Sequence, residues 1–176
     1  MERNGIRVNS KKLQEMLQEF TRQKEVYAKT PREYLGNINL NSHKKVKEAL
    51  IKKGIMVEDI RQETLHPHIF PHLYLWDYQI YKKFRYYRSQ AAGILAKTDS
   101  STGRIYPKYS QIGAPNGRLS CSDPNLHSIP RTEEFRSCFI PDDGCKLIIA
   151  DYLEIELRIV AEISHDERMV DAYKKG

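Results

Sequence analysis

The feature that most constrains the fold of this 176-residue chain is a long amphipathic segment at residues 73–95. Apolar side chains recur there at helical spacing, at Trp76, Ile80, Phe84, Tyr87, Ala91 and Leu95. This spacing predicts a long helix whose aromatic seam packs against a core. A second face carries Lys82, Arg85 and Arg88. Such a basic row is typical either of a solvated face or, with tyrosines interleaved, of a surface that binds nucleic-acid phosphates.

The first half of the chain contains two further helix patterns. Residues 10–27 place apolar side chains at helical spacing after Asn9 or Ser10, either of which can serve as the N-cap. A second helix is predicted from Ser42 to Gly54. Between residues 61 and 71 the pattern gives way to a polar connection, and we expect His66, His68 and His72 to lie on a loop surface rather than in a metal site.

The character of the sequence changes near Lys97, from helical to mixed. Residues 104–106 and 108–111 read as short strands, and the apolar run at residues 146–150 predicts a buried strand. Residues 155–163 read as a helix. A capping box formed by Ser164 and Glu167 predicts the start of another. The chain is therefore predicted to be an α+β protein with a boundary near residue 97.

Composition narrows the class of protein. The formal net charge of +6 and the isoelectric point of about 9.1 favour an anionic partner such as nucleic acid. Cys121, Cys138 and Cys145 form no CxxC pair, so we expect reduced thiols rather than a disulfide scaffold or a zinc site. The sequence has neither an apolar run of membrane-spanning length nor a secretion signal at Met1, which makes the cytoplasm the expected location.

Asp151 follows directly on the predicted strand at residues 146–150. A carboxylate at the exit of a buried strand is a common way to hold a metal ion, because the strand fixes the ligand while the sheet edge admits solvent. The residues alone favour, by a small margin, the simpler interpretation that Asp151 caps the following helix.

Two motifs, which follow one another in the sequence, favour the metal-binding interpretation of Asp151 instead. The segment from Asp151 to Arg158 resembles the first polymerase motif of family A DNA polymerases, usually DYSQIELR, with six of eight positions matching. Upstream, residues 117–130 resemble the GRLSSxDPNLQNIP segment of the same family, the bacterial DNA polymerase I type. Residues 39–42 with Lys44 resemble its thumb-tip motif, Tyr87 and Arg88 resemble its thumb-helix motif, and residues 102–105 resemble its TGRxH hairpin.

The resemblance implies roles for the matched residues. Asp151 and the backbone carbonyl of Tyr152 would hold catalytic Mg²⁺. Glu156 would act as the steric gate against ribose. Arg158 would order the helix that follows Asp151 by ion pairing, the alternative being a surface salt bridge. Arg118 would reach the primer terminus from the minor groove, where acceptors occupy the same place on every correct base pair. The remaining DNA contacts implied are at Arg88, Asn125, Gln111, Ser42 and Lys44.

This sequence departs from the family pattern in two ways. Leu153 and Glu154 replace the usual Ser and Gln. Ala92 stands where the thumb helix normally has a lysine, and loss of that lysine should weaken the grip on the template. In addition, the nucleotide-binding helix of the fingers and the motif with the second catalytic aspartate are absent from these 176 residues. We therefore expect the isolated chain to be inactive.

By resemblance, residues 1–96 form a helical thumb and residues 97–176 form the first part of a palm with a small, mainly antiparallel sheet. The implied function is template-directed DNA synthesis, with primer–template DNA and deoxynucleoside triphosphates as substrates and a second polymerase chain as partner. A natural split gene, a truncated product and a non-catalytic DNA-binding remnant remain alternatives, and the choice between replication and repair stays open.

Overall fold

The computed structural model describes residues 2–174, which form two compact units, the first ending at Asp142 and the second beginning at Asp143. The first unit contains β1 (Ile6–Arg7), α1 (Ser10–Leu35), α2 (His43–Lys52), α3 (Gln62–Ile69), α4 (Tyr74–Lys97), β2 (Arg104–Ile105), β3 (Lys108–Ser110), β4 (Ser120–Ser122), a 3-10 turn (Leu126–Ser128) and α5 (Glu133–Arg136). The second contains α6 (Ile155–Ser164) and α7 (Glu167–Lys174). The predicted α+β class is confirmed.

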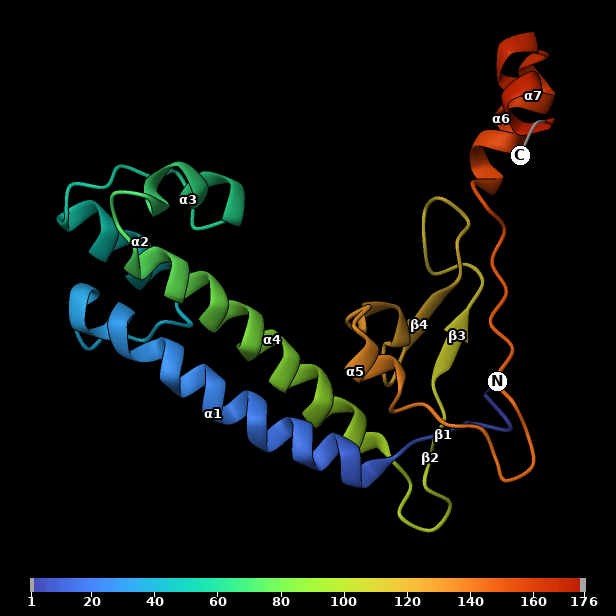
Figure 1. Ribbon diagram of the computed structural model, residues 1–176, viewed down its shortest axis with the longest axis horizontal. Helices are drawn as coiled ribbons and strands as arrows, with labels where there is room; N and C mark the ends of the chain where they lie inside the picture. Colours follow the sequence, from blue (N-terminus) through green and yellow to red (C-terminus); the bar gives the residue numbers. More distant parts are fainter. Residues whose placement is uncertain (1, 175–176) are drawn as a thin grey trace. The chain divides into compact units, whose positions relative to one another are not determined.

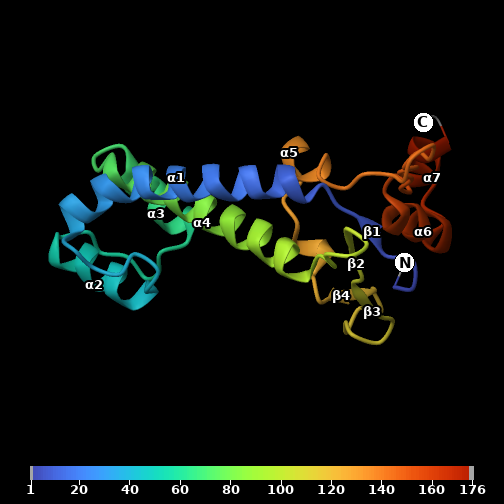
Figure 2. The same cartoon turned by 90° about the horizontal axis from the view of Figure 1, so that it is seen from below.

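An antiparallel pair of long helices, α1 and α4, forms the frame of the first unit (Figures 1 and 2). α1 begins at the predicted N-cap, Asn9, whose side chain accepts a hydrogen bond from the Lys12 backbone N–H at 3.0 Å. The helix runs beyond the predicted end at residue 27 and through Pro31, because Ala28, Pro31 and Leu35 are all buried. It ends at Gly36, whose φ of +85° is accessible at little cost only to glycine.

Two apolar cores lie along this helix pair. The first joins the end of α1 and the start of α4 to α2 and α3, and its fully buried members include Val46, Leu50, Leu65, Leu75 and Tyr78. The second joins the opposite ends of the same two helices to β1, β2 and α5, and its fully buried members include Leu13, Ala91, Ile105 and Phe135. Since α5 and β2 belong to the second core, the compact unit continues past the sequence boundary expected near residue 97.

The connection predicted between residues 61 and 71 is wrong, because residues 62–69 form α3. The polar composition and Pro67 concealed two apolar side chains one turn apart. Leu65 is fully buried in the first core and Ile69 packs against it. The Asp59 carboxylate accepts hydrogen bonds from Thr64 and from the backbone of Arg61 just before the helix. Burial of these side chains in the core therefore outweighs the low helix propensity of the local sequence.

The long helix predicted at residues 73–95 is confirmed as α4, but its buried face is displaced at the start. Trp76 was expected on the seam and is 57% exposed, whereas Tyr74, Leu75 and Tyr78 are buried. Further along, Phe84 packs its ring against Tyr27 at 5.8 Å between centroids, in agreement with the seam. The first turns of α4 face α2 and α3 as well as α1, so the buried stripe differs from that of a helix with one neighbour.

The strands form two small antiparallel ladders. β1 pairs with β2 in the register Ile6 to Ile105, and β3 pairs with β4 in the register Tyr109 to Cys121. The strand predicted at residues 146–150 is wrong: the segment is irregular, and Ile148 and Ile149 are 92% and 86% exposed. A strand requires a hydrogen-bonded neighbour, and residues 146–150 have none in the described part of the chain.

The second unit is helical beyond residue 154. The predicted helix at residues 155–163 is confirmed as α6. The predicted capping box is wrong in position, because the side chain of Asp166 caps α7 by accepting from the Met169 backbone N–H at 3.0 Å. Ser164 Oγ instead accepts from the Asp166 backbone N–H. Across residues 2–174, no helix has the length and apolar character needed to cross a membrane.

Candidate functional site

The segment that carries Asp151 leads into a turn at Leu153 and Glu154, immediately before α6 in the second unit. Glu154 has a φ of +51°, in the left-handed region that non-glycine residues occupy infrequently. Its carbonyl nevertheless accepts the first helical hydrogen bond, from the Arg158 backbone N–H at 3.0 Å. The turn therefore sets the direction in which the chain enters α6.

Arg158 holds this turn in place. Its Nε donates to the Leu153 carbonyl at 2.8 Å, and its guanidinium lies 4.8 Å from the centroid of the Tyr173 ring on α7. Tyr173 in turn donates its hydroxyl to the Glu154 carboxylate at 3.0 Å. Arg158 thus links the turn before α6 to α7. Tyr173 could not be identified from local pattern, because it lies fifteen positions from Arg158 on a different helix.

Asp151, Tyr152 and Glu156 are all exposed on or beside this turn, and Glu156 lies in the first turn of α6. The Asp151 carboxylate and the Tyr152 carbonyl are hard oxygen donors of the kind that Mg²⁺ prefers. Within residues 2–174, however, no group of three or more His, Cys, Asp or Glu side chains is arranged to hold a metal ion. The donors fit Mg²⁺ in kind, but on their own they are too few to complete its coordination.

Gln111 and Arg118 lie at opposite ends of one hairpin loop in the first unit. β3 and β4 pair with Ser110 opposite Ser120, so the two residues flank the loop at residues 111–119, and both are exposed. Gly113 in this loop lies so close to Ser120 that a Cβ atom would collide with its hydroxyl. The structure therefore brings these two predicted DNA contacts to the same end of the β3–β4 ladder.

Asn125 lies on the segment that follows this hairpin, and α4 fixes that segment. The Asn125 side chain accepts from the His127 backbone N–H at 3.0 Å and caps the short 3-10 turn. Next to it, Lys97 pairs with the Asp123 carboxylate at 2.5 Å, and Lys108 pairs with the same group at 3.3 Å. These hydrogen bonds, the one from Lys97 foremost, lower the pKa of Asp123.

The basic row of α4 has a different environment at each position. Lys82 turns towards the protein, donating to the Ile60 carbonyl at 2.7 Å, and partial burial lowers its pKa. Arg85 donates to the Asn41 side chain at 3.2 Å, and Arg88 donates to Thr21 at 3.2 Å while remaining exposed. Of the three, Arg88 retains the exposure that a phosphate contact requires.

Ser42 and Lys44 lie at the start of α2, next to Asn41. Ser42, where this helix was predicted to begin, is its N-cap and accepts from the Lys45 backbone N–H at 3.3 Å, and Lys44 is exposed. Asn41 accepts from Tyr81 and Arg85 of α4, which fixes this loop against the helix. Sequence reasoning missed the function of Asn41 because its partners lie some 40 positions away.

The predicted residues are thus distributed over both units. Those for DNA contact belong to the first unit: Arg88 lies on α4, Ser42 and Lys44 follow the Asn41 loop beside Tyr81, Asn125 follows the Asp123 segment beside Lys97, and Gln111 and Arg118 lie on the β3–β4 hairpin loop. The stretch of α4 that supports the Asn41 loop and the Asp123 segment runs from Tyr81 to Lys97. At 1.5 Å per residue, this stretch of helix is about 24 Å long. Those for metal binding and sugar recognition, Asp151, Tyr152, Glu156 and Arg158, belong to the second unit.

Comparisons with known proteins agree on one family over nearly the whole chain. The family described as DNA polymerase family A matches residues 10–176. DNA polymerase I of Caldicellulosiruptor bescii is 38% identical over 154 residues, which is 78% of this chain and 18% of that protein. DNA polymerase I of Geobacillus stearothermophilus is 30% identical over 200 residues, which covers 100% of this chain and 22% of that protein.

A solved structure agrees with the sequence relatives. The POL domain of Pol1 from M. smegmatis, in complex with a DNA primer–template and a dNTP, superimposes with a TM-score of 0.83 at 28% identity, over 93% of this chain and 31% of that one. This chain therefore spans about a fifth of the length of the curated relatives named above.

Proposed function

This chain belongs to DNA polymerase family A, and we propose that its residues form the DNA-gripping thumb and the first part of the catalytic palm of a DNA-directed DNA polymerase. The proposed reaction is transfer of a deoxynucleotide to a primer 3′-hydroxyl. The observation that carries the proposal is the order of its elements: exposed DNA-contact candidates at α2, on α4 and at the β3–β4 hairpin, followed by Asp151 just before the turn that leads into α6 and Glu156 in the first turn of that helix.

The proposed DNA-binding surface consists of Ser42, Lys44, Arg88, Gln111, Arg118 and Asn125. The stretch of α4 between Tyr81 and Lys97, which supports the segments that carry Ser42, Lys44 and Asn125, is about 24 Å long and corresponds to roughly seven base pairs at 3.4 Å each. Exposed Arg88 and Lys44 suit phosphates, whereas Arg118 on its hairpin suits the minor-groove acceptors of the primer terminus. This division matches what a polymerase needs, namely a strong grip that does not depend on sequence.

The proposed catalytic segment is the turn before α6. Asp151 and the Tyr152 carbonyl would hold Mg²⁺, which when bound stabilises negative charge on the transferring phosphoryl group. Glu156 would exclude the 2′-hydroxyl of a ribonucleotide, and Arg158 would keep the turn rigid through Leu153. The remaining metal ligands and the triphosphate contacts would come from further polymerase sequence, on the same polypeptide or on a second chain, and the assembled enzyme would act in the cytoplasm.

Primer extension tests the proposal directly, in the polymerase that contains this chain or in a mixture with polypeptide supplying the fingers and the remaining palm. Asp151→Asn should lower the rate about a thousandfold or more, because loss of a metal ligand removes several kcal/mol of transition-state stabilisation. Glu162→Gln is the matched control, since it removes an exposed carboxylate from the same unit. Activity indifferent to Asp151, or DNA binding without any extension, would instead support a non-catalytic DNA-binding protein.

A further inference from the structure

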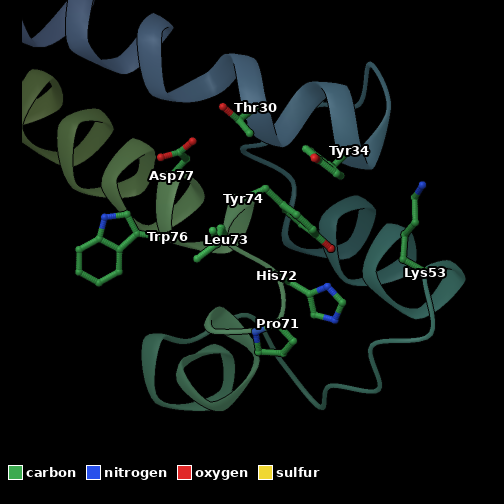
Figure 3. A pocket seen from close by; sticks show the side chains of 9 residues that line it. All are labelled: Thr30, Tyr34, Lys53, Pro71, His72, Leu73, Tyr74, Trp76 and Asp77. Carbon is green, nitrogen blue, oxygen red and sulfur yellow. The ribbon is translucent and has the colours of Figure 1, made fainter.

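A cavity of about 590 Å³ lies where α1 ends and α4 begins, in the first unit (Figure 3). Its walls include Tyr34 from α1, Lys53 from the end of α2, and His72, Tyr74, Trp76 and Asp77 from the start of α4 and the residues before it. We call it the aromatic cavity. No residue of the proposed DNA-binding surface or the proposed catalytic segment contributes to it.

The aromatic cavity presents ring faces to solvent. Tyr34 is 55% exposed and stacks on the buried ring of Tyr74, with centroids 5.0 Å apart and an interplanar angle of 8°. Trp76, two residues after Tyr74 on α4, also lines the cavity and is 57% exposed. Exposed aromatic faces held on a packed scaffold are platforms on which planar rings stack, and every nucleobase offers such a ring.

A second cavity, of about 430 Å³, adjoins the first and shares Lys53 with it. Its charged lining consists of Lys45, Lys52, Lys53 and Glu48, and Asn37 and Asn39 add polar side chains. We call it the lysine cavity. Within the described part of the chain, none of its three lysines forms an ion pair. Three ammonium groups against one carboxylate favour an anionic ligand group such as a phosphate.

We propose that these two cavities together bind single-stranded nucleic acid, with a base in the aromatic cavity and a neighbouring phosphate in the lysine cavity. The pairing of a stacking platform with an adjacent cationic hollow is the arrangement by which single strands are held without sequence preference. Asp77 directs the orientation, since its carboxylate lines the aromatic cavity and repels a phosphate from it. This function goes beyond the grip on duplex DNA proposed above.

Trp76 is the single tryptophan of the 176-residue chain, so tryptophan fluorescence reports directly on the aromatic cavity. Titration with a 12-nucleotide oligothymidylate should quench the fluorescence of Trp76 as a base stacks on the platform. Lys53→Gln should weaken binding and reduce the slope of log affinity against log salt by about 0.7, the value for one phosphate contact on a single strand. Lys11→Gln removes the same charge from an exposed position outside both cavities and should leave the slope due to this site unchanged.

A labelled oligothymidylate, followed by anisotropy, tests the platform itself. Trp76→Leu should weaken binding about fivefold or more, because stacking contributes roughly 1–3 kcal/mol per base. Phe70→Leu removes an aromatic ring that is even more exposed and does not line the cavity, and should have no such effect. Circular dichroism of each variant checks that the helices are retained.

Two results would overturn the inference. One is binding of the oligonucleotide with no change in Trp76 fluorescence and equal affinity for the Trp76→Leu and Phe70→Leu variants. The other is quenching of Trp76 by an apolar or proline-rich peptide and not by the oligonucleotide, which would make the cavity a protein-docking site. Blunt duplex DNA, tested with Arg88→Ala, reports the proposed polymerase grip separately, so either function can fail without the other.

Discussion

Phe135 provides the sharpest test of how the first unit is held together. Its side chain is fully buried, stacked on Phe20 of α1 at 5.7 Å and edge-on to Tyr87 of α4 at 5.5 Å. These contacts connect α5 to both long helices. If the first unit folds as one body, removing this ring should destabilise the distant parts of the helices as well as α5.

The magnitude follows from burial. Truncating a fully buried phenylalanine to alanine costs about 3–5 kcal/mol through lost transfer free energy and the cavity left behind. Loss of the two ring pairs places Phe135→Ala towards the upper part of that range. A domain of this size has a free energy of unfolding of about 5–15 kcal/mol, so the variant should lose a large share of its stability.

Urea denaturation with two probes measures this effect. Circular dichroism at 222 nm follows the helices. The fluorescence of the exposed Trp76 follows the start of α4, which packs in the first core and lies at the opposite end of the helix from Phe135. Both transitions of Phe135→Ala should shift together to lower urea concentration. Phe70→Ala is the control: Phe70 is 92% exposed, and the change should stay within about 0.5 kcal/mol.

Either of two outcomes would refute this reasoning. A loss below about 1 kcal/mol would mean that Phe135 is not packed as described. A Trp76 transition that stays at the position of the unsubstituted chain, while part of the circular dichroism signal is lost earlier, would mean that residues up to 97 fold independently of residues 98–142. That second outcome would restore the boundary expected from the sequence.

The remaining predictions concern the site and the core. Tyr173→Leu removes the ring beneath the Arg158 guanidinium and should speed amide hydrogen exchange at residues 153–158, whereas Tyr173→Phe should retain most of the protection. Burial raises the pKa of Tyr78 to about 12. The neutral phenol therefore contributes its full stability below pH about 10, and this contribution is lost as pH rises through 12. In alkaline denaturation, Tyr78→Phe should lose less stability than the unsubstituted chain. Glu156→Ala should raise ribonucleotide incorporation in the assembled polymerase, and unchanged discrimination would remove Glu156 as the gate. Arg88→Ala should weaken duplex binding equally on all sequences and reduce the salt slope by about 1, as measured by anisotropy.

Much of the helical architecture could be predicted from local pattern. The starts of α1 and α2 followed from Asn9 and Ser42, whose side chains cap the first turn, and these caps depend on residues three positions apart. The motif at residues 151–158 likewise pointed to the family, which the comparisons confirm. Such features are local, so a chain read in order reveals them.

The errors have a common cause. α3 was missed because its formation depends on burial of Leu65 in a core contributed by three other helices. Trp76 was placed inside because its spacing fits the seam, although the neighbours of α4 at that end select Tyr74 and Tyr78 instead. Residues 146–150 have the composition of a strand but lack a partner strand in the described part of the chain.

The sequence by itself determined the family and the identities of the residues proposed for DNA contact, metal binding and sugar recognition, because these depend on side-chain type and order. Only the tertiary structure decided which of them remain accessible. In the folded chain Lys82 donates to the Ile60 carbonyl and Arg88 remains exposed, while the Tyr173 hydroxyl donates to Glu154 in the turn that follows Asp151. The tertiary structure also formed the aromatic and lysine cavities from residues 30–77, since packing brings together side chains that no sequence spacing relates.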